Sequence, residues 1–242
     1  MNQTIRELMA RKSVRAFEDR EIGAAEREAI LLAAVNAPTA GNQQLYTIID
    51  VTNPALKARL AESCDHQPFI AEAKLVLIFC ADCRKWYQAF SDAGCQPRQP
   101  GAGDLLLAVS DANIAAQNAV VAAESLGIGS CYIGDIMENC EIHREMLHLP
   151  RWVMPCCMLV FGYPTEQQKQ RPKPPRVALR HVVHENAYRD MDGGELREML
   201  SGKAKTMSYD EWMRRFCDFK FNSDFSREMT RSVREYLTDF DE

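Results

Sequence analysis

The sequence of 242 residues predicts an α+β fold in which a central mixed or antiparallel sheet is flanked by helices. Three short apolar segments, 46–52, 74–81 and 154–163, are typical of buried strands. The segment 104–127 is apolar on nearly all sides, which predicts a long helix buried at the centre. Helices and strands alternate without strict regularity, and this favours a mixed layer over a doubly wound parallel sheet.

The first fifty residues predict two helices and a strand. Thr4 can cap a helix over "TIRELM", with Glu7 as its partner in a capping box. Residues 24–36 are rich in alanine and leucine and predict a second helix, which must stop before Pro38. The strand 46–52 follows, so a glycine-containing turn connects the two elements.

The middle of the chain predicts helix, strand and helix again. Pro54 is a favourable first residue for a helix, and the apolar run 74–81 predicts a fully buried strand. Residues 84–103 mix aromatic side chains with glycine, proline and glutamine, and we expect a variable excursion that could serve as a lid. After the long helix 104–127, "GIGSCYIGDI" at 127–136 predicts a strand or a strand-to-loop segment.

The last third predicts one more buried strand and then helices. The strand 154–163 is followed by a polar, proline-rich connection over 164–176, and "HVVHEN" at 181–186 could form a short strand. Beyond it the pattern predicts two or three charged amphipathic helices, whose aromatic side chains are too numerous for a loose tail. We therefore expect a domain over 1–192 and a helical C-terminal extension over 193–242, whose apolar faces pack on a partner subunit or fold back on their own.

Composition excludes several classes of partner. The formal net charge is -5, so no overall charge attracts the chain to nucleic acid or to an anionic membrane. We expect no apolar run long enough to span a bilayer and find no signal-like block at the N-terminus. Nine cysteines at irregular spacing indicate free thiols in a reducing cytoplasm.

A cationic cluster lies near the N-terminus of this acidic chain. The heptapeptide "RKSVRAF" places Arg11, Lys12 and Arg15 around Ser13. Guanidinium groups bind phosphate through paired hydrogen bonds, and a serine hydroxyl adds another donor. A helix C-terminus also attracts cations, so the cluster alone fits either a phosphate clamp or an ordinary helix end. A second basic cluster, "RPKPPR" at 171–176, could close around the same phosphate.

Two further segments could bring their backbone close to a ligand. "APTAGNQQLY" at 37–46 combines Gly41 and other small residues with three amide side chains in one turn. The glycines of 127–136 suit N–H groups that face a ligand, or close packing of the long helix. Their spacing is not GxGxxG, and they follow a helix instead of preceding one, which excludes the dinucleotide-binding fingerprint.

The pair Cys80 and Cys83 forms a CxxC motif directly after a buried strand. A thioredoxin-like pair requires a βαβ unit that does not precede it, and zinc requires further ligands at suitable spacing. We therefore expect neither a redox pair nor a metal site. The five histidines show no metalloprotease motif and no spacing to a nucleophile.

In this order the segments resemble the nitroreductase family of FMN flavoproteins. The resemblance covers about residues 1–190 and depends on "RKSVRAF", "APTAGNQQ", "AAQNAVVAAESLGIGSCYIGDI" and "KPPRVALRHVVHEN". It implies a nitroreductase-like α+β fold and an intertwined homodimer with two FMN sites at the interface. It also implies a C-terminal segment that crosses onto the partner subunit.

The resemblance further implies which residues hold FMN. The phosphate and ribityl chain would contact Arg11, Lys12, Ser13 and Arg15. Arg176 would join at the phosphate, and Lys173 is a further candidate there. From the other subunit the flavin would be lined by Pro38, Thr39, Ala40, Asn42 and Gln44. The flavin's polar edge would be reached by Gln67, and its N5 and O4 edge would face the backbone of Ile133, Gly134 and Asp135.

The implied activity is hydride transfer by the cofactor, with no catalytic side chain. NADH or NADPH would reduce FMN and leave, and a nitroaromatic, quinone or enone-like acceptor would take its place in a ping-pong reaction. Two alternatives of the same fold are a reductive dehalogenase and an oxygen-using, flavin-fragmenting enzyme. A third, from a different class, is a non-catalytic FMN carrier or sensor.

Overall fold

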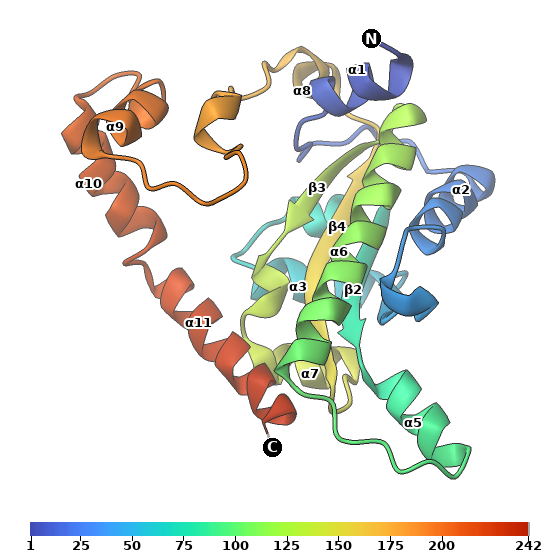
Figure 1. The fold of residues 1–242 in the computed structure, drawn as a ribbon. Helices are drawn as coiled ribbons and strands as arrows, with labels where there is room; N and C mark the ends of the chain where they lie inside the picture. Colours follow the sequence, from blue (N-terminus) through green and yellow to red (C-terminus); the bar gives the residue numbers. More distant parts are fainter. Residues whose placement is uncertain (242) are drawn as a thin grey trace. The chain divides into compact units, whose positions relative to one another are not determined.

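The computed structural model describes residues 1–241, which divide into two compact units (Figure 1). Unit 1 runs over residues 1–172 and resumes at Glu228, and unit 2 spans Lys173–Arg227. The sheet lies entirely in unit 1. The predicted extension 193–242 therefore contributes to both units, because its last part returns to the unit that holds the sheet.

The sheet has four strands among the described residues, in the order β1-β2-β4-β3, and each neighbouring pair is antiparallel. The strands are β1 (Tyr46–Asp50), β2 (Leu75–Asp82), β3 (Gly129–Ile133) and β4 (Val153–Gly162). The α+β prediction is confirmed, and the sheet is antiparallel. Every residue of the central strands β2 and β4 is buried, as their unbroken apolar runs predict.

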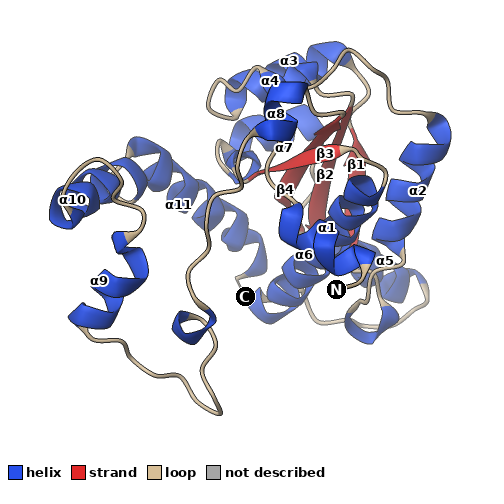
Figure 2. Ribbon diagram, turned by 90° about the horizontal axis from the view of Figure 1, so that it is seen from above, coloured by secondary structure: helices blue, strands red, loops and turns tan. Residues whose placement is uncertain are grey.

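Helices cover both faces of the sheet (Figure 2). Side chains alternate along β2, so Leu77 and Phe79 belong to one core while Val76 and Ile78 belong to the other. The first core lies under α2 (Ala24–Val35) and α6 (Ala102–Ser125). The second lies under α3 (Pro54–Ser63), α4 (Phe69–Glu72) and α7 (Cys140–Leu147).

The long helix α6 is the buried central helix that the sequence predicts. Asp104 accepts the N–H of Gly101 at 2.8 Å and so begins the helix with a capping box. By length and composition α6 could cross a membrane, so the expectation that no apolar run reaches this length is wrong. Buried core helices pass the same test, and α6 contributes a row of fully buried alanines to the core.

Two local predictions are wrong. The first helix, α1 (Gln3–Ala10), is capped by Asn2, whose side chain accepts an N–H of the first turn at 3.0 Å, so Thr4 lies inside the helix. Residues 181–186 form no strand, and a single 3-10 turn, η3 (Leu179–His181), lies there instead. Val182 and Val183 are adjacent and both exposed, so the segment lacks the alternation of a half-buried strand.

The excursion over 84–103 contains a helix that the sequence did not predict, α5 (Arg84–Asp92). The indole N–H of Trp86 donates to the carbonyl of Gln43 at 2.8 Å, which ties α5 to the turn before β1. The C-terminal helices are confirmed as α9 (Gly193–Ser201), α10 (Tyr209–Lys220) and α11 (Asp224–Leu237). The remaining short elements are η1 (Ala40–Asn42), η2 (Asp135–Met137), α8 (Glu166–Gln170) and η4 (Thr238–Phe240).

Candidate cofactor site

Backbone hydrogen bonds hold the cationic N-terminal segment against the sheet. The N–H of Val14 donates to the carbonyl of Ser130 on β3 at 2.9 Å, and Ser13 forms a parallel bridge with the same residue. Four residues on, the N–H of Glu18 donates to the carbonyl of Tyr163, just past β4, at 2.8 Å. These bonds fix the backbone of this segment beside the sheet, and so fix the positions from which its side chains extend.

Two glycines allow this close approach. A Cβ atom at Gly129 would lie 2.6 Å from Cγ2 of Val14, and one at Gly162 would lie 2.6 Å from Cδ1 of Phe17. The two glycines face each other in the β3–β4 ladder. Any larger residue at either position would therefore push the cationic segment away from the sheet.

Arg11 is half-buried, and part of its guanidinium has no hydrogen-bond partner among the described residues. Its guanidinium lies 5.8 Å from the centre of the Tyr132 ring. Within residues 1–241, its Nε and Nη2 atoms are buried and have no hydrogen-bond partner, and the same holds for the hydroxyl of Ser130. Buried donors of a cation that lack a partner favour an anion, and a phosphate ester supplies acceptor oxygens of the right charge. The residues present therefore fit the phosphate group of FMN.

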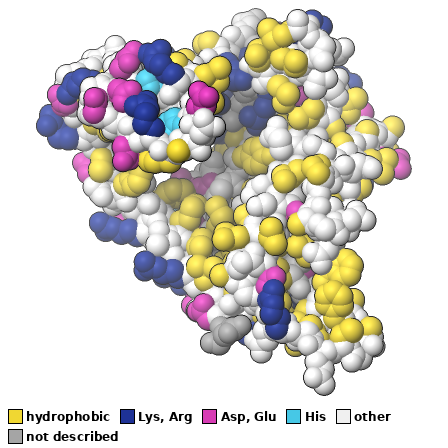
Figure 3. Space-filling view, in the orientation of Figure 1, with side chains coloured by type: hydrophobic (Ala, Val, Ile, Leu, Met, Phe, Trp, Pro, Cys, Tyr) yellow, Lys and Arg dark blue, Asp and Glu magenta, His cyan; other side chains and the backbone are white. Residues whose placement is uncertain are grey.

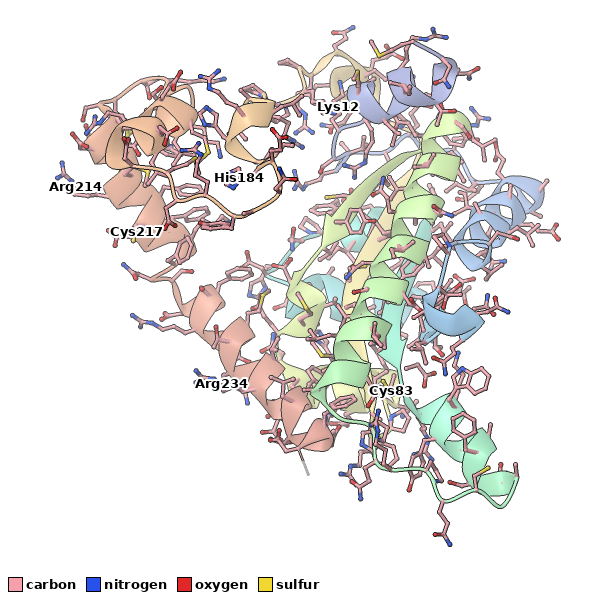
Figure 4. All side chains as sticks on the ribbon, viewed as in Figure 1. Lys12, Cys83, His184, Arg214, Cys217 and Arg234 are labelled. Atoms are coloured by element: carbon pink, nitrogen blue, oxygen red, sulfur yellow. The ribbon has the colours of Figure 1, made fainter. Side chains whose placement is uncertain are left out.

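Lys12 and Arg171 connect the N-terminal segment to the connection after β4. The ammonium of Lys12, labelled in Figure 4, donates to the carbonyls of Lys169, at 2.7 Å, and Arg171. In return, Nη2 of Arg171 donates to the carbonyl of Ser13, and its Nε is buried without a partner among the described residues. The predicted ligand Lys12 is thus occupied by carbonyls. Arg171 lies beside Ser13, although the sequence assigned it only to a basic cluster.

Arg15 points toward a different part of the predicted site. It is exposed, and its guanidinium lies 5.9 Å from the centre of the Phe69 ring on α4. Gln67, two residues before that ring, donates from its side chain to the carbonyl of Cys64 at 2.8 Å. The structure therefore brings Arg15 toward the turn that carries Gln67, while the amide of Gln67 holds the end of α3.

Asp111 organises the predicted flavin-lining turn, and sequence reasoning missed it. This carboxylate on α6 is 3% exposed and accepts hydrogen bonds from three groups of the turn. The donors are the hydroxyl of Thr39, the N–H of Ala40 at 3.0 Å and the N–H of Leu45 at 3.2 Å. A lone acidic residue within "AVSDANIAA" on an otherwise apolar helix was the available signal.

The rest of the turn depends on unusual backbone angles. Gly41, Asn42 and Gln44 all have positive φ, at 57°, 57° and 51°. The side chain of Gln44 donates to the carbonyl of Val35 at 2.9 Å, so this amide closes the turn onto α2. Pro38 and Asn42 are exposed and available to another molecule.

The predicted N5-edge residues lie at the end of β3. Ile133 is buried and pairs with Met158, and the chain then enters η2 through Gly134 and Asp135. Three residues further on, Glu138 is 6% exposed, and its Oε1 has no partner within the described part of the chain. Burial raises the pKa of Glu138 to about 7, with smaller contributions from the charges of Asp135, Asp65 and Glu228. Nothing in the sequence distinguished this residue.

Arg176 lies in unit 2, and we describe it within that unit. It is exposed, and its guanidinium donates to the carbonyl of Pro174 at 3.3 Å. Its assignment to the phosphate stays a prediction from the resemblance.

The CxxC pair is buried and carries no redox features. Cys80 and Cys83 (the latter labelled in Figure 4) are both buried, and all nine cysteines are free. Burial raises the pKa of the Cys83 thiol to about 12 and that of Cys80 well above its usual value. A reactive thiol needs the opposite shift. Among residues 1–241, no group of three or more His, Cys, Asp or Glu side chains could hold a metal ion.

Comparisons with known proteins agree with one another. A model of the nitroreductase family matches residues 8–163. The oxygen-insensitive NADPH nitroreductase of Salmonella typhimurium is 38% identical over 193 residues, covering 79% of this chain and 77% of its own. The FMN reductase [NAD(P)H] of Bacillus subtilis is 31% identical over 238 residues, covering 98% and 91%. The similarity between this chain and the B. subtilis reductase therefore continues past residue 190 of this chain.

Solved structures support the same fold. The NfrA1 nitroreductase from B. subtilis superposes with a TM-score of 0.80 at 27% identity. The superposition covers 94% of this chain and 98% of that chain, so both share nearly the whole architecture.

Proposed function

The chain belongs to the nitroreductase family, and from this premise we propose that it is an FMN-dependent NAD(P)H oxidoreductase that reduces nitroaromatics, quinones or related acceptors. The observation that carries the proposal is that two buried guanidinium nitrogens of Arg11, and the hydroxyl of Ser130, have no hydrogen-bond partner within residues 1–241. The printed names of the curated relatives, an NADPH nitroreductase and an FMN reductase, support the donor and the cofactor.

We assign the phosphate end of FMN to the N-terminal segment. Arg11 would bind the phosphate through the donors that lack partners, and Ser13 and Arg15 would hold the ribityl chain. Lys12 would act through the carbonyls that it binds, by keeping Arg171 beside Ser13. Arg176 would complete the phosphate site.

The isoalloxazine end has two sets of contacts in this proposal. Within one subunit, the backbone of Ile133, Gly134 and Asp135 and the amide of Gln67 would orient the ring and exclude water from its edge. The partner's copy of the 37–46 turn would contribute the other set: Pro38, Thr39, Ala40, Asn42 and Gln44. When bound, FMN supplies the chemistry, accepting hydride from a nicotinamide and passing it to the acceptor.

A homodimer fits the exposed apolar surface of unit 1. Helices α2 and α6 are in contact, and Figure 3 shows hydrophobic side chains scattered over the surface of the molecule. Five exposed apolar side chains come from these two helices: Leu106, Leu107, Ile114, Leu32 and Val35. An apolar surface of this kind indicates an interface, and in the proposed dimer the 37–46 turn of each chain would reach the flavin site of the other. The proposal includes an arm from unit 2 onto the partner and a cytoplasmic location, in line with nine free cysteines.

Anaerobic reduction tests this function. The purified protein should be yellow, release FMN on denaturation, and lose its colour when NADH or NADPH is added without oxygen. An acceptor such as a nitroaromatic or a quinone should then restore the colour. A protein that binds FMN but keeps its colour with both nicotinamides would be a carrier or sensor, and one that takes up no FMN would contradict the cofactor assignment.

A further inference from the structure

A short connection links the predicted flavin edge to α7. Residues 134–139 are all that separate the end of β3 from the first residue of that helix. At its start the connection is held by the β3–β4 ladder, and Ile136 is fully buried in the second core. At its other end the chain turns through Asn139, with φ of 49°, into α7. Wherever the N-terminus of α7 lies, the connection must follow.

That helix N-terminus is capped from another part of the chain. Asn139 occupies the cap position, but its side chain makes no capping bond and donates instead to the carbonyl of Ser63 at 2.9 Å. The N–H of Asn139 is bound by Oε1 of Glu228 at 3.2 Å, and the N–H of Cys140 by the hydroxyl oxygen of Ser232 at 3.0 Å. The caps thus come from α11, more than eighty residues later in the sequence.

The two acceptor side chains, Glu228 and Ser232, are held in place by further hydrogen bonds. The hydroxyl of Ser232, which is fully buried, donates to Oε1 of Glu228 at 2.7 Å. A hydrogen bond from Arg231 lowers the pKa of Glu228 to about 2, so the capping group stays a carboxylate at neutral pH. A negative charge at a helix N-terminus is favourable because the helix dipole is positive there. Arg231 also binds both oxygens of Glu141, at 2.8 Å each, and so joins α11 to α7 a second time.

We propose that Glu228 and Ser232 are positioning residues for the flavin edge: by capping α7 they hold residues 134–139, and through them the backbone of Ile133–Asp135, in place against the cofactor. Glu228 is also the residue at which the chain re-enters unit 1 after unit 2. In this proposal α11 acts on the cofactor site indirectly, because it holds the backbone segment that faces the flavin. This inference rests on the proposed function.

Variants of the two capping residues test the inference. Glu228→Ala and Ser232→Ala should each weaken FMN binding about five- to tenfold, because one cap is lost at the end of the connection. They should also shift the midpoint potential of bound FMN, because the N–H and C=O groups near its edge move. Glu228→Gln keeps an acceptor oxygen and should restore both values toward those of the parent chain. FMN affinity is measured by fluorescence titration and the potential by anaerobic dye equilibration.

The matched control removes a contact that α7 makes with η4, the turn directly after α11. Asp239 binds Arg144 in the last turn of α7 at 2.6 Å, far from the capped end. Asp239→Ala should lower the thermal midpoint of the protein, as Glu228→Ala does, but leave FMN affinity and potential unchanged.

The outcomes separate this inference from the proposed function. If Asp239→Ala changes affinity and potential as much as the capping variants, or if none of them changes either, the positioning role is overturned. Should Glu228→Ala fail to fold, Ser232→Ala removes a single oxygen atom and decides the matter alone. If the parent chain itself takes up no FMN, it is the proposed function that fails.

Discussion

At the scale of single residues, Arg11 carries the strongest indication of an anionic ligand. Its buried Nε and Nη2 atoms have no hydrogen-bond partner within the described residues, and their desolvation is not offset in the absence of a counter-charge. The position of Arg11 is determined by the segment that follows it. That segment forms a backbone hydrogen bond with Ser130, and Gly129 leaves the space for its close approach. The cation is therefore held ready before any ligand arrives.

Arg11→Met should weaken FMN binding and leave the cofactor-free protein at least as stable as before. Losing one partner of a buried charge pair costs about 2–5 kcal/mol of binding free energy, while removing an unpaired charge relieves desolvation. Fluorescence titration with FMN and thermal unfolding without it measure the two effects. Arg6→Met, at an exposed position of α1, the helix that ends just before Arg11, should change neither. Equal affinities for the two variants would contradict the phosphate assignment.

Glu138 should make stability depend on pH. Because burial raises the pKa of Glu138 from 4.5 to about 7, the folded chain holds this proton more tightly than the unfolded chain. Its contribution is therefore most favourable below pH 4.5 and is lost as pH rises through 7, amounting to about 3 kcal/mol at most.

Glu138→Gln, a neutral side chain of the same shape, should stabilise the protein at pH 8 and change little at pH 4.5. Urea unfolding at the two pH values measures the difference. Glu145→Gln, at an exposed position of α7, is the control and should have little effect at either pH. A loss of stability for Glu138→Gln that is the same at both pH values would show that the carboxyl is not buried in its neutral form.

At the scale of elements, a helix and a turn are joined by one carboxylate. Asp111 on α6 satisfies three donors of the 37–46 turn, whose positive φ angles are unfavourable on their own. The position of the turn is thus determined by the central helix and not by its own sequence.

Asp111→Asn should destabilise the chain by about 2–4 kcal/mol, because an NH₂ group replaces one acceptor oxygen and leaves a buried donor unpaired. Asp104→Asn makes the same change on the same helix, where the carboxylate faces exposed Arg98, and should cost only about 1 kcal/mol. Chemical denaturation compares the two. In the proposed dimer, Asp111→Asn should also weaken FMN binding, since the turn lines the partner's flavin.

At the scale of the whole molecule, α2 and α6 expose apolar side chains that would be more stable if a partner buried them. Leu106 is 68% exposed and Leu32 is 52% exposed, on helices that otherwise belong to the core. Leu106→Asp should shift the protein toward monomer on dilution, because a charge would be buried in the interface. Ile142→Asp, at an exposed position of α7, is the matched control. Sizing over a range of concentrations should show dissociation for the first variant alone; equal behaviour would place the dimer interface elsewhere.

What the sequence determined by itself is local or repeated in pattern. The buried strands β2 and β4 and the helix α6 could be predicted because unbroken apolar runs require burial on all sides. The cationic segment could be singled out because three cations within five residues stand out in an acidic chain. The family followed from the order of four such segments, and both the fold and the family are confirmed.

Only the tertiary structure decided which distant residues support these segments. Asp111 meets the 37–46 turn across more than sixty residues, and Glu228 meets Asn139 across 89. Asp111 stands out as a lone acidic residue in its stretch of α6, and Glu228 looks ordinary in its own segment. Neither segment indicates the partner, since hydrogen-bonding capacity does not depend on sequence neighbours. The partner is chosen by packing: α6 crosses beside the turn, and α11 returns to unit 1 beside α7. Because the buried N–H groups must be satisfied, that packing makes these residues necessary, and no local pattern records it.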